Sequence, residues 1–315
     1  MQAYLVRRLI MTVPVLVGIS VIVFLVMALI PGDPARAILG AYATPENLAR
    51  VRGELGLDKP LVVQYLTWAA HLFEGDLGRS YSLDRPVLDE VLERFGATLI
   101  LSVAALALCS LFGIVAGVVS AVRQYGWADK VLTLLVLVGI STPSFWLGLL
   151  LALLFSVELG WLPASGMFAV YGGGGPLDLL RHLVLPAVTL SVVASGVIAR
   201  LTRSSMLEVL RQDYVRTARA KGVAEYRVII AHAFRAAVVN VVPVIGIQAG
   251  FVLGGAVYIE TVFQWPGVGR MLVGAIATRD ILLVQGGVLV VAVFYVLVNL
   301  VVDLAQHLLD PRIKA

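Results

Sequence analysis

The stretch GATLILSVAALALCSLFGIVAGVVSAV occupies residues 96–122 and contains no Asp, Glu, Lys or Arg. A membrane-spanning helix needs about 20 mainly apolar residues to cross about 30 Å of hydrocarbon, and this stretch is longer than that. Its apolar residues run continuously and do not alternate with polar ones, which disfavours a strand of a transmembrane β-barrel. The stretch therefore predicts a helix that crosses a lipid bilayer.

Five further runs lack charged residues, at 9–32, 131–157, 183–199, 236–259 and 281–302. The run at 183–199 is the shortest, at about 26 Å as a helix, and we expect it to borrow residues from the Leu201 side. The composition agrees with a membrane protein. Of the 315 residues, 60% are apolar and 14% charged, against about 25% charged in a soluble domain. The sequence predicts an all-α integral membrane protein with six transmembrane helices, and it excludes an ordinary soluble or disordered chain.

The first run follows Arg7 and Arg8 and so also resembles a signal peptide, but it exceeds the usual length of a signal core, which favours a retained anchor. Loop charge predicts the orientation. The segment 200–235 alone holds eight basic residues. Six further basic residues are expected on the same side of the membrane as that segment: Arg7, Arg8, Arg123, Lys130, Arg312 and Lys314. The short loops on the other side hold only Arg181, Arg270 and Arg279. Both termini are therefore expected in the cytoplasm.

These assignments divide the chain into five parts. We expect a cytoplasmic N-terminus at 1–8, the first transmembrane helix at 9–30, an external insert at 31–95, a five-helix core at 96–312 and a tail at 313–315. In the insert, Thr44 before Pro45 is typical of a helix N-cap, and the spacing of apolar residues predicts a helix over 61–73. The acidic residues of the insert, expected on a solvated face, are Asp58, Glu74, Asp76, Asp84, Asp89, Glu90 and Glu93.

The cytoplasmic loop at 203–235 holds two apolar stripes with helical spacing. The first, at Leu207, Leu210, Tyr214 and Ala218, follows SMLE at 205–208, which fits a capping box. Gly222 then fits a C-cap. The second stripe comprises Val223, Tyr226, Ile230 and Phe234. The loop thus predicts two short amphipathic helices hinged at Gly222, which either lie on the membrane surface or dock a cytoplasmic partner.

Signatures of catalysis are missing from the sequence. None of the four lysines precedes Ser or Thr, so there is no Walker A phosphate loop, and no His-Glu-x-x-His pair occurs. Cys109 is the only cysteine. We expect no enzyme activity, no catalytic residue, no metal ligand and no cofactor in this chain. The net charge of +4 is read as loop charge near lipid headgroups and not as a nucleic-acid surface.

Polar and small residues in and beside the runs have mostly structural interpretations. Glu260, Phe263 and Trp265 are expected at a membrane interface, with Glu260 as an anchor at the end of a span. The pairs Gly113/Gly117 and Gly246/Gly250 permit close helix approach, and Pro143 and Pro243 are expected to kink their helices. The runs contain no carboxylate, which disfavours an ion-coupled carrier.

The segment DYVRTARAKG at 213–222 resembles the cytoplasmic loop of ABC importer permeases, in the dipeptide, oligopeptide and nickel branch. The family pattern is Glu-Ala-Ala, three residues, Gly, nine residues, then Ile-x-Leu-Pro. Here the matching residues are Arg216, Thr217, Ala218, Gly222, His232, Phe234 and Arg235, and only Ala218 and Gly222 keep the general pattern. Further segments similar to that branch are IPGDPA at 30–35, LGLDKP at 55–60, GDLGRS at 75–80, STPSFW at 141–146, WLPASG at 161–166 and ETVFQWPGVGR at 260–270.

The resemblance implies a type I ABC importer permease bundle with an external insert after the first span, of the dipeptide permease B-like type. It also implies an ATPase-coupling loop with residues Leu210, Tyr214, Arg216, Thr217, Ala218, Arg219, Lys221, Gly222 and Glu225. Candidates for the pathway or gate are Ser141, Pro143, Asn240 and Gln248.

The partners implied are a second homologous permease, two cytoplasmic ATPases that bind ATP and Mg²⁺, an external substrate-binding protein, a peptide substrate and the lipid bilayer. The location implied is the bacterial inner membrane. A nickel or metal-chelate importer permease is the alternative that shares this architecture. A stand-alone channel or ion-coupled carrier is a less favoured alternative, followed by a membrane enzyme and a structural scaffold.

Overall fold

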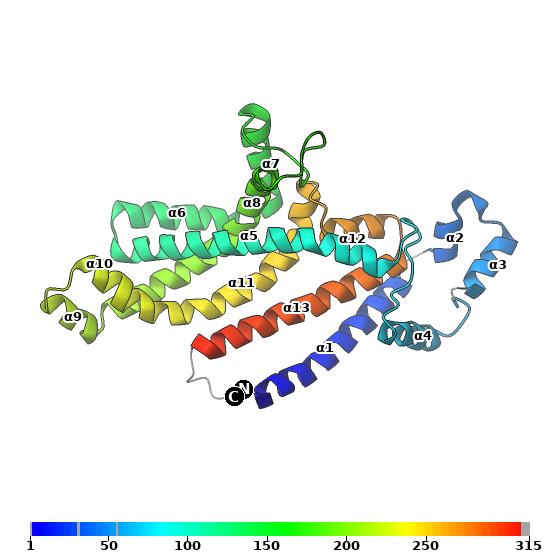
Figure 1. The fold of residues 1–315 in the computed structure, drawn as a ribbon, viewed down its shortest axis with the longest axis horizontal. Coiled ribbons are helices and arrows are strands. Elements are labelled where there is room, and N and C mark those ends of the chain that lie inside the picture. Colours follow the sequence, from blue (N-terminus) through cyan, green and yellow to red (C-terminus); the bar gives the residue numbers. More distant parts are fainter. Residues whose placement is uncertain (1, 30–31, 55, 310–315) are drawn as a thin grey trace. The chain divides into compact units, whose positions relative to one another are not determined.

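The computed structural model describes residues 2–29, 32–54 and 56–309, and these form helices and loops without a β-strand. The end of the predicted first span at Ile30, the tail at 313–315, Arg312 and Lys314 lie outside the described residues. The chain divides into two compact units, one built from 1–97 and 267–296 and the other from 98–266 and 297–315. The elements are labelled in Figure 1.

Among the described residues, five helices are long and apolar enough to cross a membrane. They are α1 (Gln2–Leu29), α5 (Val87–Val122), α8 (Pro176–Leu210), the continuous helix Glu225–Val262 that ends in α11 (Arg235–Val262), and α13 (Ile281–Leu309). A sixth candidate is the pair α6 (Trp127–Ser141) and α7 (Ser144–Ala152), the latter continuing as π-helix to Glu158. The fold is therefore an all-helical membrane bundle with five or six spans.

The third predicted run is not one straight helix. Its two halves, Trp127–Ser141 and Ser144–Glu158, meet at an angle of 106°. Thr142 and Pro143 have extended ψ angles of 126° and 128°. A proline disfavours helical backbone in the residue before it and lacks an N–H of its own, so α6 ends at Ser141. The bend predicted at Pro143 is confirmed, and it is a full break in the helix.

Two helices extend beyond the apolar runs that predicted them. Helix α5 begins at Val87, nine residues before the apolar run that starts at Gly96, and its first turns carry Asp89, Glu90, Glu93 and Arg94. Helix α8 extends to Leu210, which confirms that the short fourth run borrows residues beyond Leu201. Helix α5 thus begins with polar turns before its apolar stretch, and α8 continues through charged residues after its apolar stretch.

The described part of the insert after α1 contains the α-helices α2 (Pro34–Leu39), α3 (Pro45–Glu54) and α4 (Leu61–Phe73), with a short 3-10 helix, Gly40–Tyr42, after α2. The Thr44 hydroxyl accepts a hydrogen bond from the Asn47 N–H at 3.3 Å, which confirms Thr44 as the cap of α3. The bounds of α4 are those predicted. Asp33 accepts hydrogen bonds from the Ala35 N–H and from the Arg52 guanidinium, at 2.6 Å for the latter, and so joins α2 to α3.

The hydrophobic core of the first unit joins helices from both ends of the chain. Buried side chains come from α1, the start of α5, α12 (Val268–Ala277) and the start of α13. The members are Met27, Val87, Val91, Phe95, Val268, Met271, Ala275, Leu283 and Val284. Phe95 stacks on Phe294 with ring centroids 3.7 Å apart. The start of the second span is thus fixed by residues near the C-terminal end of the sequence.

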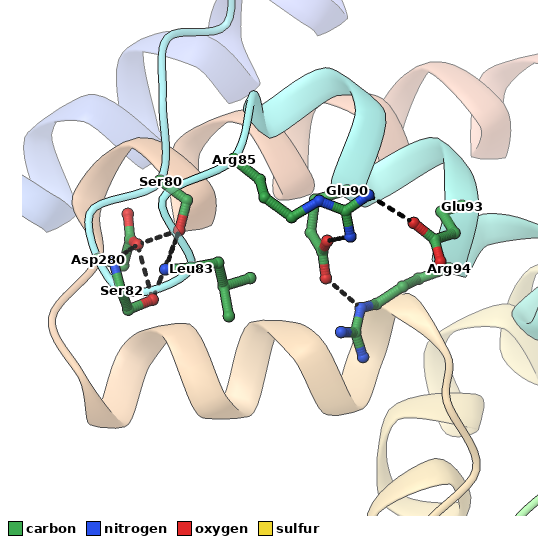
Figure 2. Close-up of polar contacts among 8 residues, drawn as sticks. All are labelled: Ser80, Ser82, Leu83, Arg85, Glu90, Glu93, Arg94 and Asp280. Carbon is green, nitrogen blue, oxygen red and sulfur yellow. Dashed lines mark hydrogen bonds and ion pairs between the residues drawn. The ribbon is translucent and has the colours of Figure 1, made fainter.

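A buried carboxylate attaches the loop before α5 to the turn between α12 and α13, as Figure 2 shows. Asp280 is 1% exposed and accepts hydrogen bonds from the Ser80 hydroxyl at 2.6 Å and from the Ser82 hydroxyl and N–H, both at 2.9 Å. Its other oxygen accepts from the Leu283 N–H at 3.2 Å. Burial and the nearby Asp280 charge raise the pKa of Tyr81 to about 12.

Glu90 does not belong to the solvated face expected for the acidic residues of the insert. It is 2% exposed, on the first turns of α5. Arg85 and Arg94 donate to its two carboxylate oxygens at 2.9 and 2.5 Å, and Arg85 also reaches the exposed Glu93 (Figure 2). A carboxylate this buried needs such charge-assisted hydrogen bonds, which the sequence pattern did not reveal.

In the second unit, α8 is the central helix and packs against α6, α7 and α11. Glycines allow the closest approaches: a Cβ atom added to Gly113 or Gly117 on α5 would lie 2.7 Å from Ile198 Cβ or 2.5 Å from Thr202 Cβ on α8. The close approach predicted from the Gly113/Gly117 pair is confirmed.

The end of α11 differs from its predicted role at a membrane interface. Phe263 and Trp265 are 1% and 0% exposed, so both rings are packed inside the protein. Glu260 is fully buried as well and accepts a hydrogen bond from the Thr98 hydroxyl at 2.6 Å. Its expected role as an exposed anchor at the end of a span is therefore wrong, because its partner lies on α5, far away in the sequence.

Candidate functional site

The segment 211–234 connects α8 to α11 and holds the predicted coupling residues. Helix α8 ends at Leu210, and α9 (Asp213–Ala220) begins after Arg211 and Gln212. Ser205 is buried in the interior of α8, so its expected role as an N-cap is wrong. The first predicted stripe is divided between two helices, because the membrane helix simply continues through the Ser-x-x-Glu pattern.

A tight corner follows α9, as predicted at Gly222. This residue has φ of +74°, a conformation that favours glycine. The Gly222 N–H donates to the Arg219 carbonyl at 2.9 Å, and the Val223 N–H donates to the Ala218 carbonyl at 3.3 Å. These two bonds form a Schellman motif. Across the corner, the Arg219 guanidinium donates to both carboxylate oxygens of Glu225, the shortest distance being 2.6 Å.

The second predicted stripe does not form a separate short helix. Helix α10 (Glu225–Arg227) passes into a π-helical stretch, Val228–Phe234, and then directly into α11. π-Helical turns inside helices are frequent at functional sites. The corner at Gly222 is therefore followed directly by the long helix Glu225–Val262. On its other side, α9 is joined to α8 through the two residues Arg211 and Gln212.

Buried apolar side chains fix the segment to the helix ends. Met206, Ala233 and Ala237 pack with Ala121 of α5 in one cluster, all 3% exposed or less. On α9 the buried residue is Val215, which is fully buried. The sequence stripe pointed instead to its neighbour Tyr214, which is 47% exposed.

The outer face of the segment is apolar and basic together. Tyr214, Tyr226 and Ile230 are exposed, the last at 63%. Of the predicted coupling residues, Leu210 and Ala218 are half-buried, and those exposed are Tyr214, Arg216, Thr217, Arg219, Lys221, Gly222 and Glu225. The Arg216 guanidinium lies 3.7 Å from the Asp213 carboxylate, and its side chain is 72% exposed. Exposed aromatic and basic side chains on a rigid support are typical of a protein-binding surface.

A second group of polar residues supports α8 just before the segment. Asp129, on α6 and 5% exposed, accepts two hydrogen bonds from the Arg203 guanidinium, both at 2.9 Å, and one from the Tyr125 N–H. The Ser120 hydroxyl of α5 also donates to Asp129. The group therefore joins α5, α6 and α8 at one level. Sequence reasoning missed it, because the charges stood at the ends of runs that were defined by lacking charge.

The four pathway candidates come from two places. Ser141 and Pro143 are exposed and flank the break between α6 and α7. Asn240 is exposed and Gln248 is 6% exposed, both on α11. Helix α7 packs against α11, but among the described residues no hydrogen bond joins the two pairs. No group of three or more potential metal ligands forms among the described residues either.

The broken helix pair, the long apolar helices and the anchored connecting segment together define a multi-pass membrane protein with the fold of a type I ABC importer permease. Solved structures share this fold. Two inward-facing crystal forms of the MetNI methionine ABC transporter match with TM-scores of 0.56 and 0.58 at 16% identity, covering 71% and 70% of this chain and 97% and 96% of theirs.

The chain belongs to the family of binding-protein-dependent transport system inner membrane components. The model of this family matches residues 113–315, and the model of its N-terminal region matches residues 1–102. A putative peptide transport system permease protein of Brucella abortus is 45% identical over 100% of this chain and 99% of its own length. The dipeptide transport system permease protein DppB of Alkalihalophilus pseudofirmus is 42% identical over the full length of both, and the glutathione transport system permease protein GsiC of Salmonella typhi is 43% identical over 100% and 99%.

Proposed function

We propose that this chain is one of two permease subunits of an ATP-driven importer of dipeptides or oligopeptides, and that it forms half of the translocation pathway. The observation that carries the proposal is the anchored corner at Gly222. Its outer face exposes Tyr214, Tyr226 and Ile230 with basic neighbours, while Val215 and Val228 beneath are fully buried. Such a surface suits a groove on another protein, and its rigid support suits the transmission of motion.

In this proposal ATP and Mg²⁺ are bound by two ATPase subunits that dock on the corner, and this chain supplies no catalytic group. Closure of the ATPases displaces α9, and the Schellman corner and the Arg219–Glu225 pair pass that displacement to the helix that begins at Glu225. The bundle then changes from inward-open to outward-open. Reversing a 1:99 equilibrium to 99:1 requires about 5.5 kcal/mol of differential binding, which the ATPase contacts supply.

The other partners proposed are a second, homologous permease and an external substrate-binding protein. The basic segment 200–235 favours a cytoplasmic location for the corner by the positive-inside rule, and with it cytoplasmic termini and an external insert in the bacterial inner membrane. The insert and core boundaries proposed from the sequence are 31–95 and 96–312, and α5 begins within the insert at Val87.

Peptide is favoured over nickel as the substrate, since relatives of 42–45% identity are named for peptide, dipeptide and glutathione transport. Pathway lining is proposed for Ser141, Pro143, Asn240 and Gln248. The break beside Pro143 supplies backbone groups outside regular helix, which membrane proteins tolerate beside a water-filled cavity.

The experiment that tests the proposal is purification of the tagged chain from native membranes in a mild detergent, with mass spectrometry of the proteins that accompany it. We expect a second permease and ATPases with a Walker A motif. Reconstituted with the binding protein, the complex should take up a labelled dipeptide only with ATP inside the proteoliposome, and excess nickel should not compete. Isolation of the chain as a homo-oligomer that transports without ATP would contradict the proposal and support a channel or carrier.

A further inference from the structure

Helix α4 of the insert has the composition of a membrane helix without the length. Its sequence LVVQYLTWAAHLF contains no Asp, Glu, Lys or Arg. At about 1.5 Å per residue its 13 residues extend about 20 Å, too short to cross about 30 Å of hydrocarbon. Charged residues flank both ends, Asp58 and Lys59 before it and Glu74 and Asp76 after it. Both ends therefore belong in water or at the interface, on the same side.

One face of α4 contacts the C-terminal half of the first membrane span. The rings of Tyr65 and Trp68 lie 5.4 and 5.9 Å from the ring of Phe24 on α1, centroid to centroid. The Tyr65 hydroxyl lies 2.9 Å from Ser20 Oγ. Because Ser20 Oγ already donates to the Val17 carbonyl at 2.7 Å, Tyr65 is the donor in this bond.

The position of Ser20 gives the depth of this contact. The candidate span of α1 extends over Ile10–Leu29. Phe24 and Ser20 lie five and nine residues before its end, or about 8 and 14 Å along the helix axis. Half the hydrocarbon thickness is about 15 Å, so the hydroxyl of Tyr65 lies within the hydrocarbon of the leaflet at the C-terminal end of α1. A phenol at that depth requires a hydrogen-bond partner, and Ser20 provides one.

The rest of the α4 surface, away from Tyr65 and Trp68, exposes large apolar side chains. They are Val62 at 69%, Val63 at 42%, Leu66 at 60% and Phe73 at 94%. No residue of α4 is buried, so the helix is not part of a water-soluble core. A contiguous apolar face of this kind on a soluble segment would be an aggregation site, whereas acyl chains would cover it without cost.

We propose that α4 is immersed in the lipid leaflet at the C-terminal end of α1, with Tyr65 and Trp68 toward α1 and Val62, Leu66 and Phe73 toward acyl chains. Figure 1 shows α4 beside the C-terminal part of α1. The insert is then attached to the membrane through its own apolar helix, in addition to the spans that flank it. This proposal requires only that α1 crosses the bilayer, and it stands apart from substrate, ATPase and orientation.

Site-directed spin labelling tests the proposal in the reconstituted transporter. Cys109 is the only cysteine and is buried, so Cys109→Ala gives a background in which L66C and V62C carry a nitroxide alone. V26C, on the exposed side of α1 (53% exposed), is the lipid control, and A49C, exposed on α3, is the aqueous control. A single symmetric gel-filtration peak and an unchanged unfolding temperature in detergent establish that each variant is folded.

We expect the labels at residues 62 and 66 to collide with oxygen, which concentrates in lipid, several-fold more than with a water-soluble nickel chelate, as the label at residue 26 does. The label at residue 49 should show the reverse preference. Two results would overturn the proposal: chelate access at residue 66 equal to that at residue 49, which places α4 in water, or protection from both reagents, which places the face of α4 against a protein.

Discussion

Arg219 and Glu225 form an ion pair across the Gly222 corner, with Arg219 Nη2 2.6 Å from Glu225 Oε1. Both side chains are substantially exposed, at 41% and 56%, so the pair contributes little to the free energy of unfolding, about 1 kcal/mol or less. Its geometry nevertheless fixes α9 relative to the helix that follows. Substitutions in this pair can therefore test the mechanical role of the corner with little change in the free energy of unfolding.

Charge reversal at this pair should affect coupling and not folding. We expect Arg219→Glu to lower the thermal unfolding temperature little and to reduce substrate-stimulated ATP hydrolysis strongly, because two like charges open the corner. The double variant Arg219→Glu/Glu225→Arg should recover much of the stimulation. ATPase assays in proteoliposomes measure both. Equal loss in the single and double variants would mean that Arg219 acts through contact with a partner and not through Glu225.

The effect of a substitution at Gly222 should depend on the backbone conformation that the new residue tolerates and not on the size of its side chain. No atom lies within 4 Å of a Cβ added there, so the cost comes from the positive φ, about 1–2 kcal/mol for a β-carbon residue and less for Asn. Gly222→Pro also removes the N–H that donates to the Arg219 carbonyl. We expect Gly222→Asn to retain stimulated ATP hydrolysis and Gly222→Pro to abolish it, with membrane insertion intact in both. Normal stimulation in Gly222→Pro would refute the assignment of this loop.

Val215 and Tyr214 are adjacent, but we expect their substitution by Ala to affect different properties of the protein. Val215 is fully buried, so Val215→Ala should lower the free energy of unfolding of the segment by about 1–2 kcal/mol and be visible as increased protease cleavage after residue 211. Tyr214→Ala removes an exposed ring and should leave cleavage unchanged while weakening ATPase co-purification. The reverse pattern would show that α9 has the opposite face toward the partner.

The Asp129–Arg203 pair should be important for stability. Asp129 is 5% exposed and the Arg203 side chain 31%, so removal of Asp129 should cost less than the figure of about 3–5 kcal/mol for a fully buried pair. We expect Asp129→Ala to lower the unfolding temperature in detergent markedly, and Asp129→Asn/Arg203→Gln to be closer to the native protein than Asp129→Ala. Asp84→Ala, which breaks an ion pair whose members are 63% and 87% exposed, is the control and should shift the temperature little.

Enlarging Gly117 should separate α5 from α8. An added Cβ would lie 2.6 Å from the Ala199 carbonyl oxygen, which is backbone and has no room to move, and overpacking of this kind costs about 1–3 kcal/mol. Gly254→Ala, on α11 with no atom within 4 Å of the added carbon, should be neutral or stabilising. Thermal unfolding of the two variants in the same detergent provides the comparison, and equal unfolding temperatures would contradict the close packing of α5 and α8.

The parts of this fold that depend on local sequence were predictable. Residues 61–73 form a helix because their apolar spacing, the preceding Pro60 and the charged flanks all agree. Gly222 ends α9 because few other residues adopt its backbone conformation. The capping-box interpretation of Ser205 failed for the complementary reason: a Ser-x-x-Glu pattern also occurs inside helices, and nothing nearby stopped α8.

The parts that depend on distant partners were not predictable from one sequence. Glu260 is buried because Thr98, 162 positions away, donates to it, and Asp129 is buried because Arg203 lies 74 positions away. A carboxylate at the end of an apolar run looks the same whether it faces water or a partner. The four pathway candidates show the same limitation, since polarity alone selected both the exposed Asn240 and the buried Gln248.

The Ser80–Asp280 hydrogen bond joins residues 200 positions apart, and this separation bears on how the chain is made. A ribosome synthesises the loop at residues 80–83 and the start of α5 long before Asp280, Leu283 and Val284 exist. Until then Val87 and Val91 lack the neighbours that bury them. Contacts this distant in sequence slow folding. The first quarter of the chain therefore cannot complete its packing until the last span has been synthesised and inserted. Truncation just before α13 should therefore destabilise the N-terminal region around Val87 and Val91 as much as the C-terminal end of the truncated chain.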